Sequence, residues 1–245
     1  MKKLLIFFFL LFNLSAKEKQ ESITMGIGLY SQTQPYKNVE KLLIPTPIVF
    51  FDNNIFYVRW TRVGLYFFGK KQKNYAWAFS LTAMPRTYGY SSKDIVNMKE
   101  RKNSWEGGFS FIGKMQNIYL ESMLLTDILG RYDSYVFKTD IGYNFKMAKF
   151  SFYPSINITY QSSSFTNYYY GVKKIEIMDN RIEYIVKSDY QLGVQTYIKY
   201  PITQKLSIFI NLKVDKLSTE VRNSPLVNDK YIYSSLLSCI YTFHY

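Results

Sequence analysis

The stretch LLSCIYTFHY, residues 236–245, alternates large apolar side chains with smaller or more polar ones. A repeat of two residues is that of a β-strand, whose successive side chains point to opposite faces. One face would carry Leu237, Cys239, Tyr241, Phe243 and Tyr245. Because a soluble domain seldom ends on so aromatic a strand, the question is what these rings contact.

The opposite end of the chain predicts export. MKKLLIFFFLLFNLSA, residues 1–16, has two lysines, an apolar run and then small residues up to Ala16. This pattern is typical of a secretory signal peptide and is too short for a spanning helix. We expect cleavage after Ala16, which leaves a single domain of residues 17–245. Beyond residue 16 the sequence has no apolar run of about 18 residues, so no helical span is expected.

The composition favours strands. Tyr and Phe number 24 and 19, and aromatic residues make up 19% of the chain. Aromatic residues are enriched in strands. A single cysteine, Cys239, excludes an intramolecular disulfide framework and a cysteine-based zinc site. We therefore expect an exported all-β protein.

The alternation recurs in twelve segments separated by turn-forming residues. We expect strands near residues 22–31, 43–51, 55–61, 63–69, 75–84, 104–113, 117–125, 133–145, 149–160, 187–200, 205–216 and 230–245. The connections are alternately short and long, apart from a tight link near Thr61–Arg62. This asymmetry is typical of an outer-membrane barrel with short periplasmic turns and longer extracellular loops. The sequence thus predicts a transmembrane antiparallel β-barrel of about twelve strands, located in the cell outer membrane.

A secreted β-sandwich is the alternative, and its apolar face would point inward. The connection asymmetry and the aromatic last strand favour the barrel, in which the apolar face contacts lipid and polar residues line the lumen. We expect the lipid-facing set to include Leu237, Tyr241, Phe243, Tyr245, Ile208 and Ile210. The lumen set would include Arg59, Glu121, Lys138, Asp140, Gln195 and Lys213.

Five stretches resemble the MipA/OmpV family (MltA-interacting protein and OmpV). They are LIPTPIVFFDNNIFYVRW (43–60), KDIVNMKERKNSWEGGFSF (93–111), TDILGRYDSYVFKTDIGY (126–143), NYYYGVKK (167–174) and SPLVNDKYIYSSLLSCIYTFHY (224–245). The sequence departs from the family pattern at Asn97, where the family has Gly, and in the charged segment KKIEIMDNRIEY. The resemblance implies an outer-membrane protein that links a murein lytic transglycosylase to a murein synthase. Adhesion is a second role found in the family.

The residues argue against catalysis. A hydrolase of the Ser–His or Asp–His type needs a histidine as proton carrier, and the only one is His244, near the expected periplasmic boundary. Asp140 and Glu121 form a carboxylate pair, but Lys138 and Arg59 lie on the same expected face, so mutual charge pairing is the favoured interpretation. No metal-ligand spacing or phosphate-binding loop is present. We therefore expect no enzymatic activity, no cofactor and no metal.

The short turns are rich in lysine: Lys70, Lys71, Lys73, Lys114, Lys146, Lys149 and Lys205. Such a basic surface would attract anionic murein or an acidic partner, with an on-rate that falls with salt. Lysines that merely solvate tight turns are the simpler alternative. Outer-membrane lipid and lipopolysaccharide are further expected partners, whereas nucleic acid is not.

Two features leave alternatives open. The longest loop, residues 161–185, is aromatic and mixed in charge, so it is either a cap over the barrel mouth or a binding surface. Lipopolysaccharide phosphates are possible ligands of this loop and of Lys93, Lys99, Arg101 and Lys102. Twelve strands enclose a lumen of intermediate width, and charges of both signs inside it favour a blocked lumen over a narrow small-solute channel.

Overall fold

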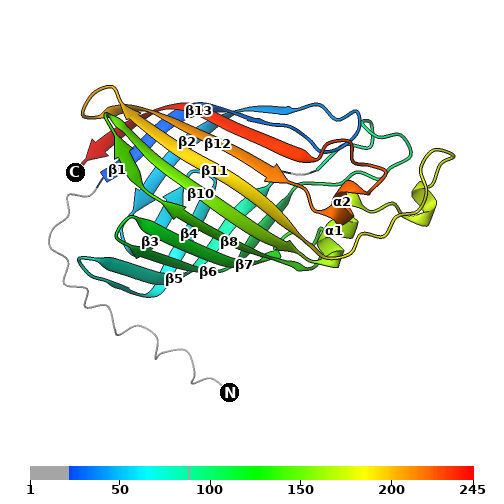
Figure 1. Ribbon diagram of the computed structural model, residues 1–245, viewed down its shortest axis with the longest axis horizontal. Helices are drawn as coiled ribbons and strands as arrows, with labels where there is room; N and C mark the ends of the chain where they lie inside the picture. The colour runs from blue at the N-terminus through cyan, green and yellow to red at the C-terminus, as the bar shows by residue number, and fades with distance from the viewer. Residues whose placement is uncertain (1–21, 88) are drawn as a thin grey trace, which may run out of the picture.

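The computed structural model describes residues 22–87 and 89–245, which form a closed antiparallel β-barrel of twelve strands (Figure 1). The predicted signal peptide, residues 1–16, lies outside the described residues. Each strand pairs with its neighbour along the chain, and β1 pairs with β13 while β10 pairs with β11. The predicted fold class is confirmed.

Thirteen labelled segments make up the twelve strands, because β8 and β9 are two parts of one strand. The segments are β1 (Ser22–Gln32), β2 (Leu42–Asp52), β3 (Phe56–Arg59), β4 (Arg62–Lys71), β5 (Tyr75–Arg86), β6 (Ser104–Met115), β7 (Ile118–Asp127), β8 (Tyr135–Tyr143), β9 (Phe145–Met147), β10 (Phe150–Gln161), β11 (Asp189–Pro201), β12 (Leu206–Lys216) and β13 (Tyr231–His244). Both β8 and β9 pair with β10, and Pro154 of β10 lies between the two paired stretches. A proline has no N–H to donate, which accounts for an interruption of the ladder at this point.

The two ends of the barrel differ. One end, here called the short-turn end, carries residues 53–55, 72–74, 116–117, 148–149 and 202–205 together with the first residue of β1 and the last of β13. The other end, the long-loop end, carries residues 33–41, 87–103, 128–134, 162–188 and 217–230. The extended loops project from this end in Figure 1.

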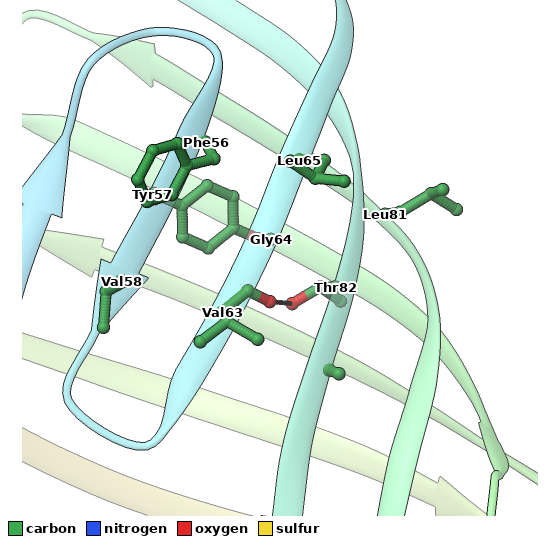
Figure 2. A pocket seen from close by; sticks show the side chains of 9 residues that line it. Phe56, Tyr57, Val58, Val63, Gly64, Leu65, Leu81 and Thr82 are labelled. Carbon is green, nitrogen blue, oxygen red and sulfur yellow. Dashed lines mark hydrogen bonds between the residues drawn. The ribbon is translucent and has the colours of Figure 1, made fainter.

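One strand is much shorter than its sequence pattern suggested. The pattern predicted a strand over residues 55–61, but β3 has only four residues, Phe56–Arg59, and turns at Trp60 and Thr61 into β4. The β3–β4 turn therefore lies within the barrel wall rather than at its edge. Figure 2 shows this turn below Val58 and Val63, while β5 continues past it.

Two glycines let tyrosine rings lie flat against the inner wall. Tyr57 is paired with Gly64, and Tyr119 is paired with Gly142. A Cβ at either glycine would clash with the ring of its partner. The missing side chain thus provides the space that each ring fills.

The long-loop end is closed by a packed apolar cluster. Helix α1 (Ser163–Tyr170) begins at Ser162, whose side chain accepts a hydrogen bond from the Phe165 N–H at 3.4 Å. The short helices η1 (Lys174–Glu176) and α2 (Thr219–Arg222) lie in the same loops. The buried residues of the cluster include Tyr36, Tyr90, Phe165, Tyr169, Tyr170, Val221 and Leu226. Loops 33–41, 87–103, 162–188 and 217–230 therefore form one folded cap.

No helix within residues 22–87 and 89–245 is both long and apolar enough to span a bilayer.

Candidate functional site at the lumen, the cap and the short-turn end

A cluster of charged side chains lies inside the lumen near the β3–β4 hairpin. Arg62 contacts Glu121 at 2.5 Å and Arg59 contacts the same carboxylate at 3.8 Å. Arg59 also pairs with Asp52 at 3.2 Å and donates to the Tyr66 hydroxyl at 2.7 Å, which in turn donates to Asp52 at 2.8 Å. Because Glu121 lies on β7, these contacts bridge β5 and β6 on the inner side of the wall.

The predicted pairing of Arg59 with lumen carboxylates is confirmed, but the sequence analysis missed Arg62. It was assigned to a tight link, whereas it is the first residue of β4 and its side chain is mostly buried. Arg62 lies two and four residues before Gly64 and Tyr66, which face the lumen. Because side-chain direction alternates along a strand, this spacing would have identified Arg62 as a lumen residue.

A second group of ion pairs lies on β8, β11 and β12. Lys138 pairs with Asp140 at 3.0 Å, and Gln195 donates to Asp140 at 3.1 Å. Lys213 pairs with Asp215 at 2.7 Å. Each pair joins residues two positions apart, which lie on the same face of one strand. The prediction that these lumen charges neutralise one another is confirmed.

The carboxylates that the sequence identified as a pair are each bound by a cation. Glu121 and Asp140 are directly opposite each other on β7 and β8, but each contacts a cation of its own. His244 is exposed at the end of β13. Within the described part of the chain, no three His, Cys, Asp or Glu side chains are grouped so that they could hold a metal.

The sequence pattern did not reveal two further buried ion pairs, one in the cap and one on β5 and β6 beneath it. Arg101 donates to both oxygens of Glu176 at 2.9 Å, and only 4% of Arg101 is exposed. Arg86 binds Glu106, which also accepts a hydrogen bond from the Tyr132 hydroxyl at 2.6 Å. The expectation that Arg101 is available for external phosphates is therefore wrong, because Glu176 occupies its guanidinium. Lys93, Lys99 and Lys102 are exposed.

The Arg101–Glu176 pair makes the stability of the cap dependent on pH. Burial favours a higher pKa for Glu176, but the N–H of Lys173 at 3.0 Å and the Arg101 guanidinium outweigh it and hold the pKa below its ordinary value. A carboxyl whose pKa is depressed by folding stabilises the fold above its unfolded pKa, and this contribution is lost as pH falls through the folded pKa.

We expect the cap to lose hydrogen-exchange protection on acidification. Peptides covering residues 163–186 of the wild type should be protected at neutral pH. Below the folded pKa of Glu176 they should exchange as fast as in the Glu176→Gln variant, after correction for intrinsic rates. Glu183 is exposed in the same loop, so Glu183→Gln, which makes the same change of charge, is the control. Its hydrogen-exchange protection should match that of the wild type at every pH. Equal protection of wild type and Glu176→Gln at neutral pH would contradict this assignment.

The outer face of the wall carries the apolar set predicted to contact lipid. Leu237, Tyr241, Phe243 and Tyr245 are all exposed, with Leu237 at 59%. Ile208 and Ile210 lie on the outer face of β12, because Ser207, Phe209 and Asn211 between them are buried inside. Their contact with lipid itself stays a prediction.

The lysines predicted to form a basic surface lie together at the short-turn end. All are exposed: Lys70, Lys71, Lys73, Lys114, Lys146, Lys149 and Lys205. The turns 53–55, 72–74, 116–117, 148–149 and 202–205 contain no Asp or Glu. Asp52 adjoins them, but Arg59 and Tyr66 bind its carboxylate. The charged side chains within these turns are therefore all lysines, and turns 53–55 and 116–117 carry no charge.

Comparison with known proteins agrees with this architecture. The family model "MltA-interacting protein MipA" matches residues 25–243. The outer membrane protein YiaT of Escherichia coli (strain K12) is 22% identical over 219 residues, which are 87% of this chain and 87% of the relative. The MltA-interacting protein of the same strain is 22% identical over 214 residues, 85% of each chain.

Among solved structures, a FadL homologue of Pseudomonas aeruginosa has a TM-score of 0.43 and 9% identity, covering 91% of this chain and 90% of that one. The relatives are named outer membrane proteins and the chain forms a barrel of that type, so the short-turn end faces the periplasm and the long-loop end faces outward. The family model covers nearly all of the described residues, and the chain therefore belongs to the MipA family of outer-membrane β-barrel proteins.

Proposed function

We propose that this barrel is a non-enzymatic scaffold that holds a murein-remodelling enzyme at the periplasmic face of the outer membrane. The observation that carries the proposal is the basic surface at the periplasmic end, formed by Lys70, Lys71, Lys73, Lys114 and neighbouring lysines. These side chains are exposed and none of the adjoining turns contains an acidic residue. Such a surface attracts anionic murein or an acidic protein.

The interior of the barrel supports a binding role over transport. The Arg59–Arg62–Glu121 cluster projects into the lumen from β3, β4 and β7, and the cap closes the extracellular end. A small-solute channel, the alternative from the sequence, would need both to move. No described feature of the lumen favours that alternative.

The names of the relatives suggest the class of partner. One relative that aligns over 85% of this chain is named MltA-interacting protein. A murein lytic transglycosylase is accordingly the partner that we propose for the basic surface, and a murein synthase is the second enzyme that such a scaffold would bring to it.

Removing the lysines should weaken the capture of such an enzyme. We expect a variant with Lys70, Lys71, Lys73 and Lys114 changed to Gln to retain less of a murein lytic transglycosylase from envelope extracts. The difference should be largest at low ionic strength, because salt screens interactions between exposed charges beyond a Debye length of about 8 Å at physiological salt. Retention is measured by quantitative mass spectrometry at several salt concentrations.

A matched control separates position from net charge. Lys37, Lys93, Lys99 and Lys187 are exposed in the extracellular loops, and changing all four to Gln removes the same charge. This control should retain the enzyme as the wild type does. Equal loss in both variants would show a general charge effect, and unchanged capture in the first would rule out the periplasmic surface as the binding site.

A second role, adhesion, is favoured by one observation on the outer side. The most distal loop exposes several isoleucines, with Ile175 at 65%, Ile182 at 71% and Ile185 at 70%. Exposed apolar groups that cluster in one loop mark interaction sites more often than isolated ones do. Ile175→Ser combined with Ile182→Ser should reduce binding of cells to a host surface if this loop is the adhesive element.

A further inference from the structure

The barrel wall has a break in its strand pairing on the extracellular half. On the side facing β3, β2 pairs only through Phe50–Asp52, and β5 pairs with β4 only as far as Ala83. Among residues 22–87 and 89–245, no strand pairs with Leu42–Ile48 of β2 on this side or with Met84–Arg86 of β5 on the facing side. We call this break, bounded by Leu42–Ile48 and Met84–Arg86, the pairing gap. It exists because the β3–β4 hairpin stops at Trp60 and Thr61 (Figure 2).

Three prolines lie on the two edges of the pairing gap. In a strand the N–H and C=O groups of successive residues point alternately to the two neighbouring strands. The Val49 C=O accepts from the Trp60 N–H at 2.8 Å, so the odd-numbered residues of β2 point toward the gap. Pro45 and Pro47 are among them.

The same argument applies to β5. The Tyr75 C=O accepts from the Gln72 N–H at 2.8 Å, so the odd-numbered residues of β5 point toward β4. Pro85 is in step with Tyr75, and its nitrogen therefore faces the gap from the other side. An N–H that is unpaired in a lipid environment costs free energy, and three prolines remove three such donors. The sequence is thus adapted to edges that stay open.

Apolar surface lies on both sides of the pairing gap. On the outside, at the periplasmic margin of the gap, there is a hollow of about 440 Å³. It is lined by Phe56, Val58, Val63, Leu65 and Leu81 among others (Figure 2). On the inside, an apolar cluster contains Ile48, Phe209, Leu236 and Ile240 with Tyr30, Phe50, Trp60 and Tyr197 packed against it. A barrel lumen is ordinarily polar, so this inner patch directly behind the gap is unusual.

There is accessible space next to this patch. Ile44 and Ile48 share the inner face of β2, and Ile48 is fully buried while Ile44 is 40% exposed. Toward its extracellular end, β2 is therefore accessible on its inner side as well as on the outer side, where Leu43 is 57% exposed.

Trp60 occupies the closed end of the pairing gap. Its φ of 57° lies in the left-handed region, which favours glycine and is costly for a bulky residue. The ring packs edge-on against Tyr30 at 5.4 Å and its Nε1–H donates to the Thr46 hydroxyl at 3.3 Å. Trp60 is thus kept in an unfavourable backbone conformation, with its ring packed against the inner patch at the closed end of the pairing gap.

We propose that the pairing gap is a lateral portal for the acyl chain of a lipopolysaccharide molecule, with Trp60 as its gate. The portal lies in the half of the wall that faces the outer leaflet, and the cap closes the extracellular route into the lumen. Exposed Lys37 and Lys41, in the connection that leads into β2, offer positive charge to lipid phosphates, with only Glu40 exposed between them. The acyl chain contacts the outer hollow and reaches the inner patch past Trp60. This inference does not depend on the periplasmic scaffold role.

Site-specific photocrosslinking in intact cells tests the portal. The photoreactive p-benzoylphenylalanine replaces Tyr30, whose ring lies inside the barrel against Trp60, and adducts are detected with an antibody to lipid A. Leu29, exposed on the outer face, is the positive control, because the outer wall of any barrel contacts lipid. Ile112, on the inner face of β6 and paired with Glu121 of β7, is the negative control, because the inner patch contains no residue of either strand.

We expect a lipopolysaccharide adduct at positions 29 and 30 and none at 112. Adding Trp60→Gly should increase the adduct at position 30 several-fold, because glycine adopts this φ freely and leaves the gate open. Folding of each variant is verified by its shift in gel mobility on boiling. If the position 30 variant does not fold, Phe50 on the inner face of β2 is the replacement site.

Three outcomes would overturn the proposal. An adduct at position 29 without one at 30 or 50 would show that no acyl chain passes the wall. Equal adducts at 30 and 112 would show entry from the periplasmic end. A phospholipid instead of lipopolysaccharide in the adduct at position 30 would show that the assigned occupant is wrong.

Discussion

Ile210→Lys is expected to lower the free energy of unfolding of the barrel in lipid vesicles by about 2–4 kcal/mol. Ile210 lies near the centre of β12, where it is paired with Ile198 of β11 and Leu237 of β13 on the outer face. A lysine near the bilayer midplane loses hydration without gaining a partner, and its reach to the interface offsets the cost only near strand ends. Urea titration monitored by tryptophan fluorescence measures the change.

Gln195→Lys is the matched control for the same substitution on the inner face. The Gln195 amide already donates to Asp140 at 3.1 Å, so a lysine at this position finds an anion within reach. Its effect should be small compared with that of Ile210→Lys. The reverse order would mean that the apolar face of the wall does not contact lipid, in conflict with the orientation of β12.

Glu121→Leu is expected to destabilise the barrel by about 3–5 kcal/mol, the usual cost of removing one partner of a buried ion pair. Glu121 is 9% exposed and contacts both Arg59 and Arg62. Arg59 keeps Asp52 as a second partner, but Arg62 would retain no carboxylate, only the Met123 sulfur at 3.3 Å and the Tyr57 ring, whose centroid is 5.9 Å away. The loss arises from the charge left on Arg62, and is measured by the same urea titration.

The double variant Arg62→Met and Glu121→Leu tests this cause. Removing both charges should recover most of the stability lost in Glu121→Leu, because replacing a whole buried pair with apolar side chains is often nearly neutral. If the double variant is as unstable as Glu121→Leu, the loss comes from packing rather than from an unpaired charge.

The two predictions concern opposite faces of one wall, and the sequence distinguished these faces correctly. Alternation with a period of two assigned Ile208 and Ile210 to one face and Gln195 and Lys213 to the other, where the structure places them. Side-chain direction in a strand is a local property of the backbone, so it can be predicted without knowledge of the partners. The same reasoning predicted the positions of the periplasmic lysines, because the ends of the alternating segments show where each strand stops and each short turn begins.

The partners of lumen residues were predictable only where they are local. Lys138 and Asp140, or Lys213 and Asp215, are two residues apart on one strand and meet for that reason. Arg62 and Glu121 are 59 residues apart, and Arg101 and Glu176 are 75 apart. These contacts depend on barrel closure and on how four loops fold over the mouth. Neither can be predicted from the two-residue alternation of side chains along single strands.

What the sequence by itself determined was therefore the fold class, the strand positions and the face on which each strand residue lies, since all three follow from local alternation and from turn lengths. The tertiary structure decided the length of β3, and with it the pairing gap. Pro45 and Pro47 are visible in the sequence, but only the register of β2 against β1 and β3 shows that their nitrogens face an edge without a partner. Register is set by the pairing of whole strands across the sheet, and it cannot be derived from one strand alone.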